Sequence, residues 1–155
     1  MIKKILAIDG GGIKGVFPAS FLSSVEDTIG DKVSNYFDLI VGTSTGGIIA
    51  LGLGMGMPSS EILSFYKELG PNIFRKKPFN AIRRLFSSKY NQAPLRSALE
   101  SKFKAFKLGE SSKRLVIPSL NLETGSVHLY KTAHHPRLEM DYKESVVSIA
   151  LATAC

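Results

Sequence analysis

Apolar and polar positions divide this chain into short apolar runs and longer segments whose apolar residues recur every three or four positions. The runs at 4–8, 37–41 and 115–122 predict buried strands, and residues 127–130 are expected to stay extended after a turn at 123–125. The helical spacing predicts helices over 17–29, 48–53, 59–69, 95–106 and 145–154. Because strands and helices alternate, we expect an α/β domain with a largely parallel central sheet.

Glycine and proline mark several expected ends. Gly30 is expected to close the first helix, and Gly70-Pro71 to end the third. The second predicted helix is apolar on all sides and is therefore expected to be buried. Pro118 has no backbone N–H, which pushes its strand toward an edge of the sheet or the residue toward the start of the strand.

Length and composition fit one globular unit, residues 1–155. Hydrophobic residues make up 44% and charged residues 21%, which excludes a disordered, collagen-like or coiled-coil chain. Lys and Arg number 20 against 13 Asp and Glu, and the net charge of +7 allows nucleic acid, anionic membrane or acidic substrates without selecting among them. The single cysteine, Cys155, permits no internal disulfide and fits a reducing compartment.

Two apolar stretches could be mistaken for targeting or membrane segments. Residues 5–8 are far shorter than the apolar core of a signal peptide. Residues 39–57 carry no charge, but their glycines and the polar Thr43, Ser44 and Thr45 favour a buried strand leading into a buried helix. We therefore expect a soluble, cytoplasmic chain with no signal peptide and no transmembrane span.

The first glycine-rich motif is Asp9-Gly10-Gly11-Gly12-Ile13-Lys14-Gly15, between a predicted strand and a predicted helix. It contains the G-x-G-x-x-G pattern of dinucleotide sites, but Asp38 precedes the second strand rather than closing it, as a ribose-binding acid would. Val16 stands where a P-loop needs lysine. Backbone N–H groups at a helix start suit any anion, including a transient oxyanion. A nucleotide site, an oxyanion site and a tight turn without a ligand all stay open for this motif alone.

The second motif, Gly42-Thr43-Ser44-Thr45-Gly46, matches G-x-S-x-G and follows a predicted strand. This context is that of a nucleophile elbow, in which a sharp turn lifts the serine hydroxyl above the sheet. We expect a Cβ at Gly42 or Gly46 to clash, because strand and helix approach closely there. Ser44 is then the candidate nucleophile, at the positive end of the following helix. The alternative is an ordinary Gly/Ser turn.

Together the two motifs predict a serine nucleophile with an oxyanion site. Adjacent parallel strands would bring both turns to one edge of the sheet, so that Gly10 to Gly12 could supply hydrogen-bond donors to the oxygen that becomes negative. A histidine-based triad is poorly supported by His128, His134 and His135, because no aspartate lies between Ser44 and His128. These histidines also lack partners at metal-ligand spacing, so we expect no metal and no cofactor.

The sequence resembles the patatin-like phospholipase family in ILAIDGGGIKG at 5–15 and YFDLIVGTSTGGIIALGLG at 36–54, and more weakly in LNLETG at 120–125 and SIALATAC at 148–155. The resemblance implies a three-layer α/β/α, modified α/β hydrolase-like domain, a Ser-Asp dyad without histidine, and hydrolysis of acyl esters of phospholipids or related lipids. It implies that Ser44 is the nucleophile and that Gly10, Gly11 and Gly12 line the oxyanion hole. Lys14 takes the place of the family's arginine or lysine, and Asp9, Gly15, Gly42, Thr43, Thr45 and Gly46 complete the two motifs.

One departure from the family concerns the general base. The family's catalytic aspartate lies in a later Asp-Gly-Gly or Asp-Gly-Ala motif, whereas the Asp-Gly-Gly of this chain is Asp9-Gly10-Gly11. We therefore expect the chain to be the N-terminal part of a longer enzyme, with the aspartate beyond Cys155. A nucleotide-binding module and a non-catalytic lipid-binding scaffold remain the alternative functions.

Residues 74–86 interleave cations with large apolar side chains. Such a segment can lie in a membrane interface and attract anionic headgroups, which predicts a peripheral membrane contact; the alternative is a surface helix packed on the domain. Because no RNA- or DNA-binding motif accompanies it, we expect no nucleic-acid partner.

Overall fold

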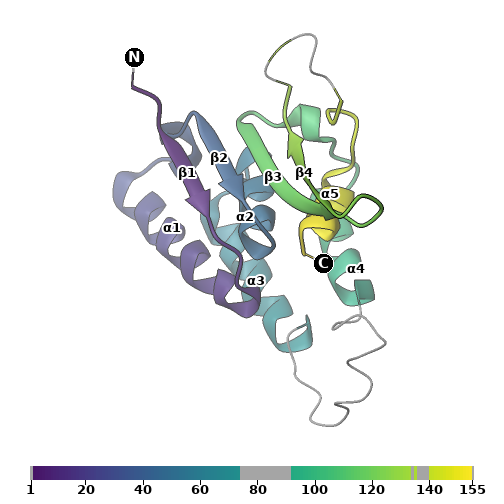
Figure 1. Ribbon diagram of the computed structural model, residues 1–155. Helices are drawn as coiled ribbons and strands as arrows, with labels where there is room; N and C mark the ends of the chain where they lie inside the picture. Colours follow the sequence, from purple (N-terminus) through teal and green to yellow (C-terminus); the bar gives the residue numbers. More distant parts are fainter. Residues whose placement is uncertain (1, 74–91, 134, 136–139, 155) are drawn as a thin grey trace.

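The protein is described by a computed structural model that covers residues 2–73, 92–133, 135 and 140–154 (Figure 1). Its centre is a four-stranded sheet in the order β1-β2-β3-β4. The strands are β1 (Ile5–Ile8), β2 (Leu39–Gly42), β3 (Arg114–Asn121) and β4 (Ser126–Lys131). β1 pairs with β2 and β2 with β3 in parallel, whereas β4 is antiparallel to β3. The expected α/β class and mainly parallel sheet are confirmed.

Helices pack on one face of this sheet and form the core with it. They are α1 (Val16–Ile29), α2 (Thr45–Gly54), α3 (Ser59–Ile73), α4 (Gln92–Phe103) and α5 (Val146–Ala154), with short 3₁₀ turns η1 (Gly12–Gly15), η2 (Val33–Tyr36) and η4 (Leu108–Glu110). Every residue of α2 is buried, which includes the apolar run 48–53 that was predicted to be buried. α2 packs on β2 and β3, α5 packs on β3 and α2, and α1 packs on α3.

The opposite face of the sheet exposes apolar side chains. Along β3, Leu115 and Ile117 are buried among the helices, while Leu120 is 58% exposed. Ile5 on β1 and Val127 on β4 are 59% and 68% exposed. Alternation along the strands therefore separates a covered face from an open one. Of the three layers that the resemblance implies, the described residues form two.

Two proline expectations are wrong. α3 does not end at Gly70-Pro71 but continues to Ile73. A proline removes one backbone hydrogen bond from a helix, and here it does so within the last turn. Pro118 lies inside β3, which is paired on both sides rather than at an edge. Its missing N–H is tolerated because pairing with β2 stops at Val116, two residues earlier.

The helix predicted over 95–106 also ends early. α4 stops at Phe103, and the next residue, Lys104, has a φ of 47° that no α-helix allows. By contrast, Gly30 closes α1 as predicted, with a φ of 69° and its N–H donating to the Glu26 carbonyl.

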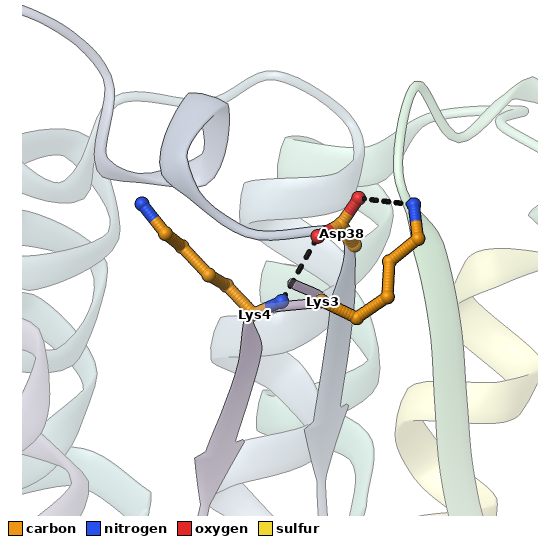
Figure 2. A network of polar contacts seen from close by, with 3 residues as sticks. All are labelled: Lys3, Lys4 and Asp38. Carbon is orange, nitrogen blue, oxygen red and sulfur yellow. Dashed lines mark hydrogen bonds and ion pairs between the residues drawn. The ribbon is translucent and has the colours of Figure 1, made fainter. Parts of the chain in front are cut away.

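Asp38 joins the starts of β1 and β2 (Figure 2). Its carboxylate accepts hydrogen bonds from the Lys4 backbone N–H and the Lys3 ammonium group, both at 2.9 Å. These two bonds, that from the Lys4 amide above all, hold the pKa of Asp38 below its usual range. The ionised carboxylate therefore ties the residues that precede β1 to the residue that precedes β2.

We predict that Asp38→Asn lowers the urea midpoint of unfolding at pH 7 and that its difference from the parent protein disappears in acid. Because the folded-state pKa is depressed, the carboxylate contributes stability above its unfolded-state pKa, and this contribution is lost as the pH falls through the folded-state value. Urea unfolding from pH 7 down to pH 2 measures this. Asp27→Asn, an exposed change on α1, is the control; equal midpoint losses in both variants would contradict the prediction.

Candidate active site

Ser44 lies at the sharp turn between β2 and α2. Its backbone has φ 52° and ψ −123°, a conformation that side-chain-bearing residues rarely adopt. The helix that follows begins at Thr45, and the Ile48 N–H donates to the Ser44 carbonyl at 3.1 Å. Ser44 therefore stands at the N-terminus of a buried helix, where the helix dipole favours developing negative charge. This is the strand-turn-helix context predicted for the G-x-S-x-G motif.

Gly42 and Gly46 allow this turn to close. A Cβ at Gly42 would overlap the Gly46 carbonyl group and would lie 2.8 Å from the Gly47 nitrogen. A Cβ at Gly46 would overlap the Ile8 carbonyl oxygen at the end of β1. Both contacts are with backbone, which cannot move aside as a side chain can. The expectation that these two positions require glycine is confirmed.

Pairing of β1 with β2 brings the two glycine motifs together. Ile8 is in register with Gly42, so the turn after β1 lies beside the turn after β2. A Cβ at Gly10 would come within 2.8 Å of the Ser44 Cβ atom. The glycine turn therefore directly borders the candidate nucleophile, as the adjacency of parallel strands predicted.

The amides of the glycine turn differ in their partners. Gly10 donates to the Thr43 hydroxyl and Gly11 to the Thr45 hydroxyl, each at 3.2 Å. Gly12, with a φ of 58°, begins η1, and the described part of the chain supplies no acceptor for its N–H. Two of the three amides predicted as oxyanion donors are thus engaged with threonine side chains, and one remains available.

The other motif residues surround this turn. Asp9 and Lys14 are exposed, with the Lys14 side chain lying over Gly11. Gly15 is buried, and a Cβ there would meet the Thr45 side chain at 3.0 Å and the Tyr66 ring at 3.2 Å. Gly15 therefore lets η1 settle against the start of α2.

Among the described residues, the Ser44 hydroxyl makes no hydrogen bond to an imidazole or a carboxylate. The His128 Nε2 atom instead lies 3.4 Å from an Asp141 carboxylate oxygen, and the His128 ring stacks edge-on with Tyr130. Both aromatic residues are on β4, and β3 separates that strand from β2. His134 lies outside the described residues, as does the basic aromatic stretch 74–86.

The position of Asp38 argues against a dinucleotide site. Asp38 precedes β2 at the strand's N-terminal end, whereas the glycine turn follows the C-terminal end of β1. The two therefore lie at opposite ends of the parallel strands, and Asp38 is already hydrogen-bonded to Lys3 and Lys4 (Figure 2). Asp38 therefore could not bind the ribose of a dinucleotide held at the glycine turn.

Comparison with known proteins decides the family. The sequence model of the family described as "Patatin-like phospholipase" matches residues 6–155. The chain belongs to the patatin-like phospholipase family. The cGAMP-activated phospholipase of Pseudomonas aeruginosa is 37% identical over 152 residues, which cover 97% of this chain and 46% of the relative. Patatin-like protein 2 of Arabidopsis thaliana is 33% identical over 170 residues, which cover 96% of this chain and 42% of the relative. The chain spans about half the length of the curated relatives it matches.

Solved structures show the same fold. ExoU, in its heterodimeric complex with SpcU from the type III secretion system of Pseudomonas aeruginosa, matches with a TM-score of 0.52 and 15% identity. The match covers 98% of this patatin-like chain and 36% of that chain. Among the helices that the structure describes, none is long and apolar enough to cross a membrane.

Two polar residues that support this patatin-like site were not singled out from the sequence. The Tyr66 hydroxyl donates to the Thr45 carbonyl at 2.7 Å, and burial raises the pKa of this phenol. The Thr153 hydroxyl accepts from the Ser44 N–H at 2.9 Å. In the sequence, Tyr66 is one of the apolar positions that predict the helix over 59–69, and nothing there indicates a role for its hydroxyl. Thr153 carried one signal, a hydroxyl within the apolar helix α5.

We predict that Gly46→Ala destabilises the patatin-like domain much more than Gly11→Ala. The added methyl group in Gly46→Ala overlaps a backbone carbonyl, and such overpacking typically costs about 1–3 kcal/mol, occasionally more. At Gly11 the new Cβ would lie 3.4 Å from the Lys14 Cβ, with φ at 178°, so little must move. Denaturant unfolding of the two variants compares the costs; equal free energies of unfolding would show that the turns do not approach this closely.

Proposed function

We propose that this chain carries the nucleophile and the oxyanion site of a serine hydrolase acting on the acyl esters of phospholipids or related lipids. The observation that carries the proposal is the junction of the two turns, where Gly10 borders the Cβ atom of Ser44. Family membership supports the class of reaction, and the elbow geometry supports Ser44 as the attacking residue.

In the proposed reaction the Ser44 oxygen attacks the carbonyl carbon of the ester and gives up its proton to a general base. The tetrahedral oxyanion then receives hydrogen bonds from backbone amides of the glycine turn, beginning with Gly12, whose N–H has no acceptor in the described chain. Collapse releases the alcohol and leaves an acyl group on Ser44, which water hydrolyses. We propose that the base is an aspartate of the full-length protein, as the family resemblance implies.

Two other functions compete with this proposal. A nucleotide-binding module would use residues 10–15 to hold phosphate, but Asp38, which would have to bind the ribose, lies at the other end of the strands and is engaged by Lys3 and Lys4. A non-catalytic lipid-binding scaffold would need no strained serine. Backbone strain of this kind costs of order 1–3 kcal/mol and concentrates at functional sites, so the conformation of Ser44 favours catalysis.

We predict that Ser44→Ala in the full-length protein abolishes nearly all phospholipid hydrolysis and all labelling by a fluorophosphonate probe. Removing the oxygen removes the attacking atom while the turn keeps its shape. Release of fatty acid from phospholipid vesicles and in-gel fluorescence measure the two effects.

Ser20→Ala is the matched control, since Ser20 is exposed on α1 and lies outside both motifs. This variant should hydrolyse lipid and react with the probe at the parent rate. Hydrolysis by Ser44→Ala at close to the parent rate would reject Ser44 as the nucleophile. Tight NAD binding without probe labelling would instead favour the nucleotide-binding module.

We further propose that the full-length protein responds to a cyclic dinucleotide. Three relatives of 35–37% identity, from Pseudomonas aeruginosa, Escherichia coli and Vibrio cholerae, carry the name cGAMP-activated phospholipase. We predict that cGAMP raises the rate of phospholipid hydrolysis by the full-length protein, whereas cyclic di-GMP at equal concentration raises it less. Rates that are identical with and without cGAMP would contradict this regulation without affecting the role of Ser44.

A further inference from the structure

Thr153 connects the candidate nucleophile to the sheet. It lies near the C-terminal end of α5 and is only 7% exposed. Its hydroxyl accepts a hydrogen bond from the Ser44 N–H at 2.9 Å and donates one to the Pro118 carbonyl at 2.6 Å. One hydroxyl thus bridges the turn after β2 and the interior of β3, using both its donor and its acceptor capacity.

This bridge replaces a direct strand-to-strand hydrogen bond. Registered pairing of β2 with β3 ends at Val41 and Val116. Beyond that point the Ser44 N–H and the Pro118 carbonyl are left without partners in the ladder, and buried backbone groups without partners are costly. The Thr153 hydroxyl fills the gap between them.

The orientation of Thr153 is not the default for a helix. A threonine in a helix commonly returns its hydroxyl to a carbonyl one turn earlier in the same helix. Here the hydroxyl leaves α5 for two other elements, and the Thr153 methyl group packs against Gly47, where an added Cβ would lie only 2.8 Å away. Thr153 is therefore fixed by contacts on both branches of its side chain.

A fixed Ser44 amide sets the direction of the Ser44 side chain. The backbone of Ser44 has a strained φ of 52°, and strain of this kind persists only where surrounding contacts enforce it. The Ile48 N–H holds the Ser44 carbonyl, and Thr153 holds the Ser44 N–H. Releasing the N–H would let the turn relax and move the hydroxyl away from the glycine turn.

We propose that Thr153 is a positioning residue for Ser44, holding the elbow in its reactive conformation through the Ser44 amide. This inference rests on the proposed function, in which Ser44 is the nucleophile. A displacement of about 1 Å from the reactive geometry can lower a rate by roughly 100-fold, so loss of this contact is expected to act on the chemical step.

The test is Thr153→Val in the full-length protein, which keeps the shape of the side chain and removes the hydroxyl. We expect kcat for phospholipid hydrolysis and the rate constant for fluorophosphonate labelling to fall by roughly 10- to 100-fold. KM should change by less than about twofold, because Thr153 is buried and acts in this proposal through the Ser44 amide rather than on the substrate. Thr153→Ser, which restores the hydroxyl, should recover most of both rates.

Thr132→Val is the matched control. Thr132 is 8% exposed, and its hydroxyl accepts from the N–H of Leu115 at 3.0 Å. Leu115 pairs with Ile40 within the β2–β3 ladder, so this bond lies before the end of the ladder at which Thr153 bridges. Like Thr153→Val, this variant removes a buried threonine hydroxyl that accepts a hydrogen bond from a backbone N–H. Its melting temperature should therefore also fall. Its kcat, measured well below both melting temperatures, should stay at the parent value.

The Ser44→Ala variant distinguishes failure of the positioning role from failure of the proposed function. If Ser44→Ala is inactive but Thr153→Val keeps the parent kcat, or if Thr132→Val lowers kcat equally, the positioning role is overturned and the proposed function stands. If Ser44→Ala keeps its activity, the proposed function fails and the positioning role falls with it.

Discussion

The approach of one backbone to another at the Gly46 position is the constraint on which this structure depends. Gly46 at the start of α2 lies against the Ile8 carbonyl at the end of β1, with no room for a side chain between them. This contact brings α2 down onto the sheet, which is why the helix is buried along its whole length. It also aligns the turn after β1 with the turn after β2, so that Gly10 borders Ser44. Packing and candidate chemistry therefore have the same cause.

Threonine hydroxyls complete the hydrogen bonding where the strands end. Thr43 and Thr45 accept from the Gly10 and Gly11 amides, and Thr153 bridges the Ser44 amide and the β3 backbone. Each hydroxyl reaches a backbone group that the sheet ladder no longer satisfies. A β-branched side chain suits this purpose because few χ1 rotamers are open to it, so its hydroxyl is held in place at little further cost in entropy. The elbow is thus held by side chains where backbone pairing fails.

Local spacing predicted most of this arrangement. The requirement for glycine at Gly42 and Gly46 followed from the sharpness of a strand-turn-helix junction, and parallel pairing implied that the two motifs would meet. Pro118 was placed wrongly, because whether a strand lies at an edge depends on partners that are distant in the sequence. The role of Thr153 could not be predicted from its one signal, a hydroxyl in an apolar helix, because its partner Ser44 is 109 residues away and only the packing of α5 on β3 and α2 brings the two together.

Nucleophile geometry and nucleophile activation are separable in this chain. Within the described part of the chain, Ser44 is contacted by the glycine turn, α2 and α5, and Thr153 of α5 is bonded in turn to β3. A hydroxyl held this way is oriented but not acidified, because a serine needs an adjacent base to become strongly nucleophilic. In the proposed reaction, the helix N-terminus and the Gly12 amide act on the charge that forms at the substrate oxygen. Under the proposed function, the described fold therefore supplies orientation and charge stabilisation, and a separate general base takes the Ser44 proton.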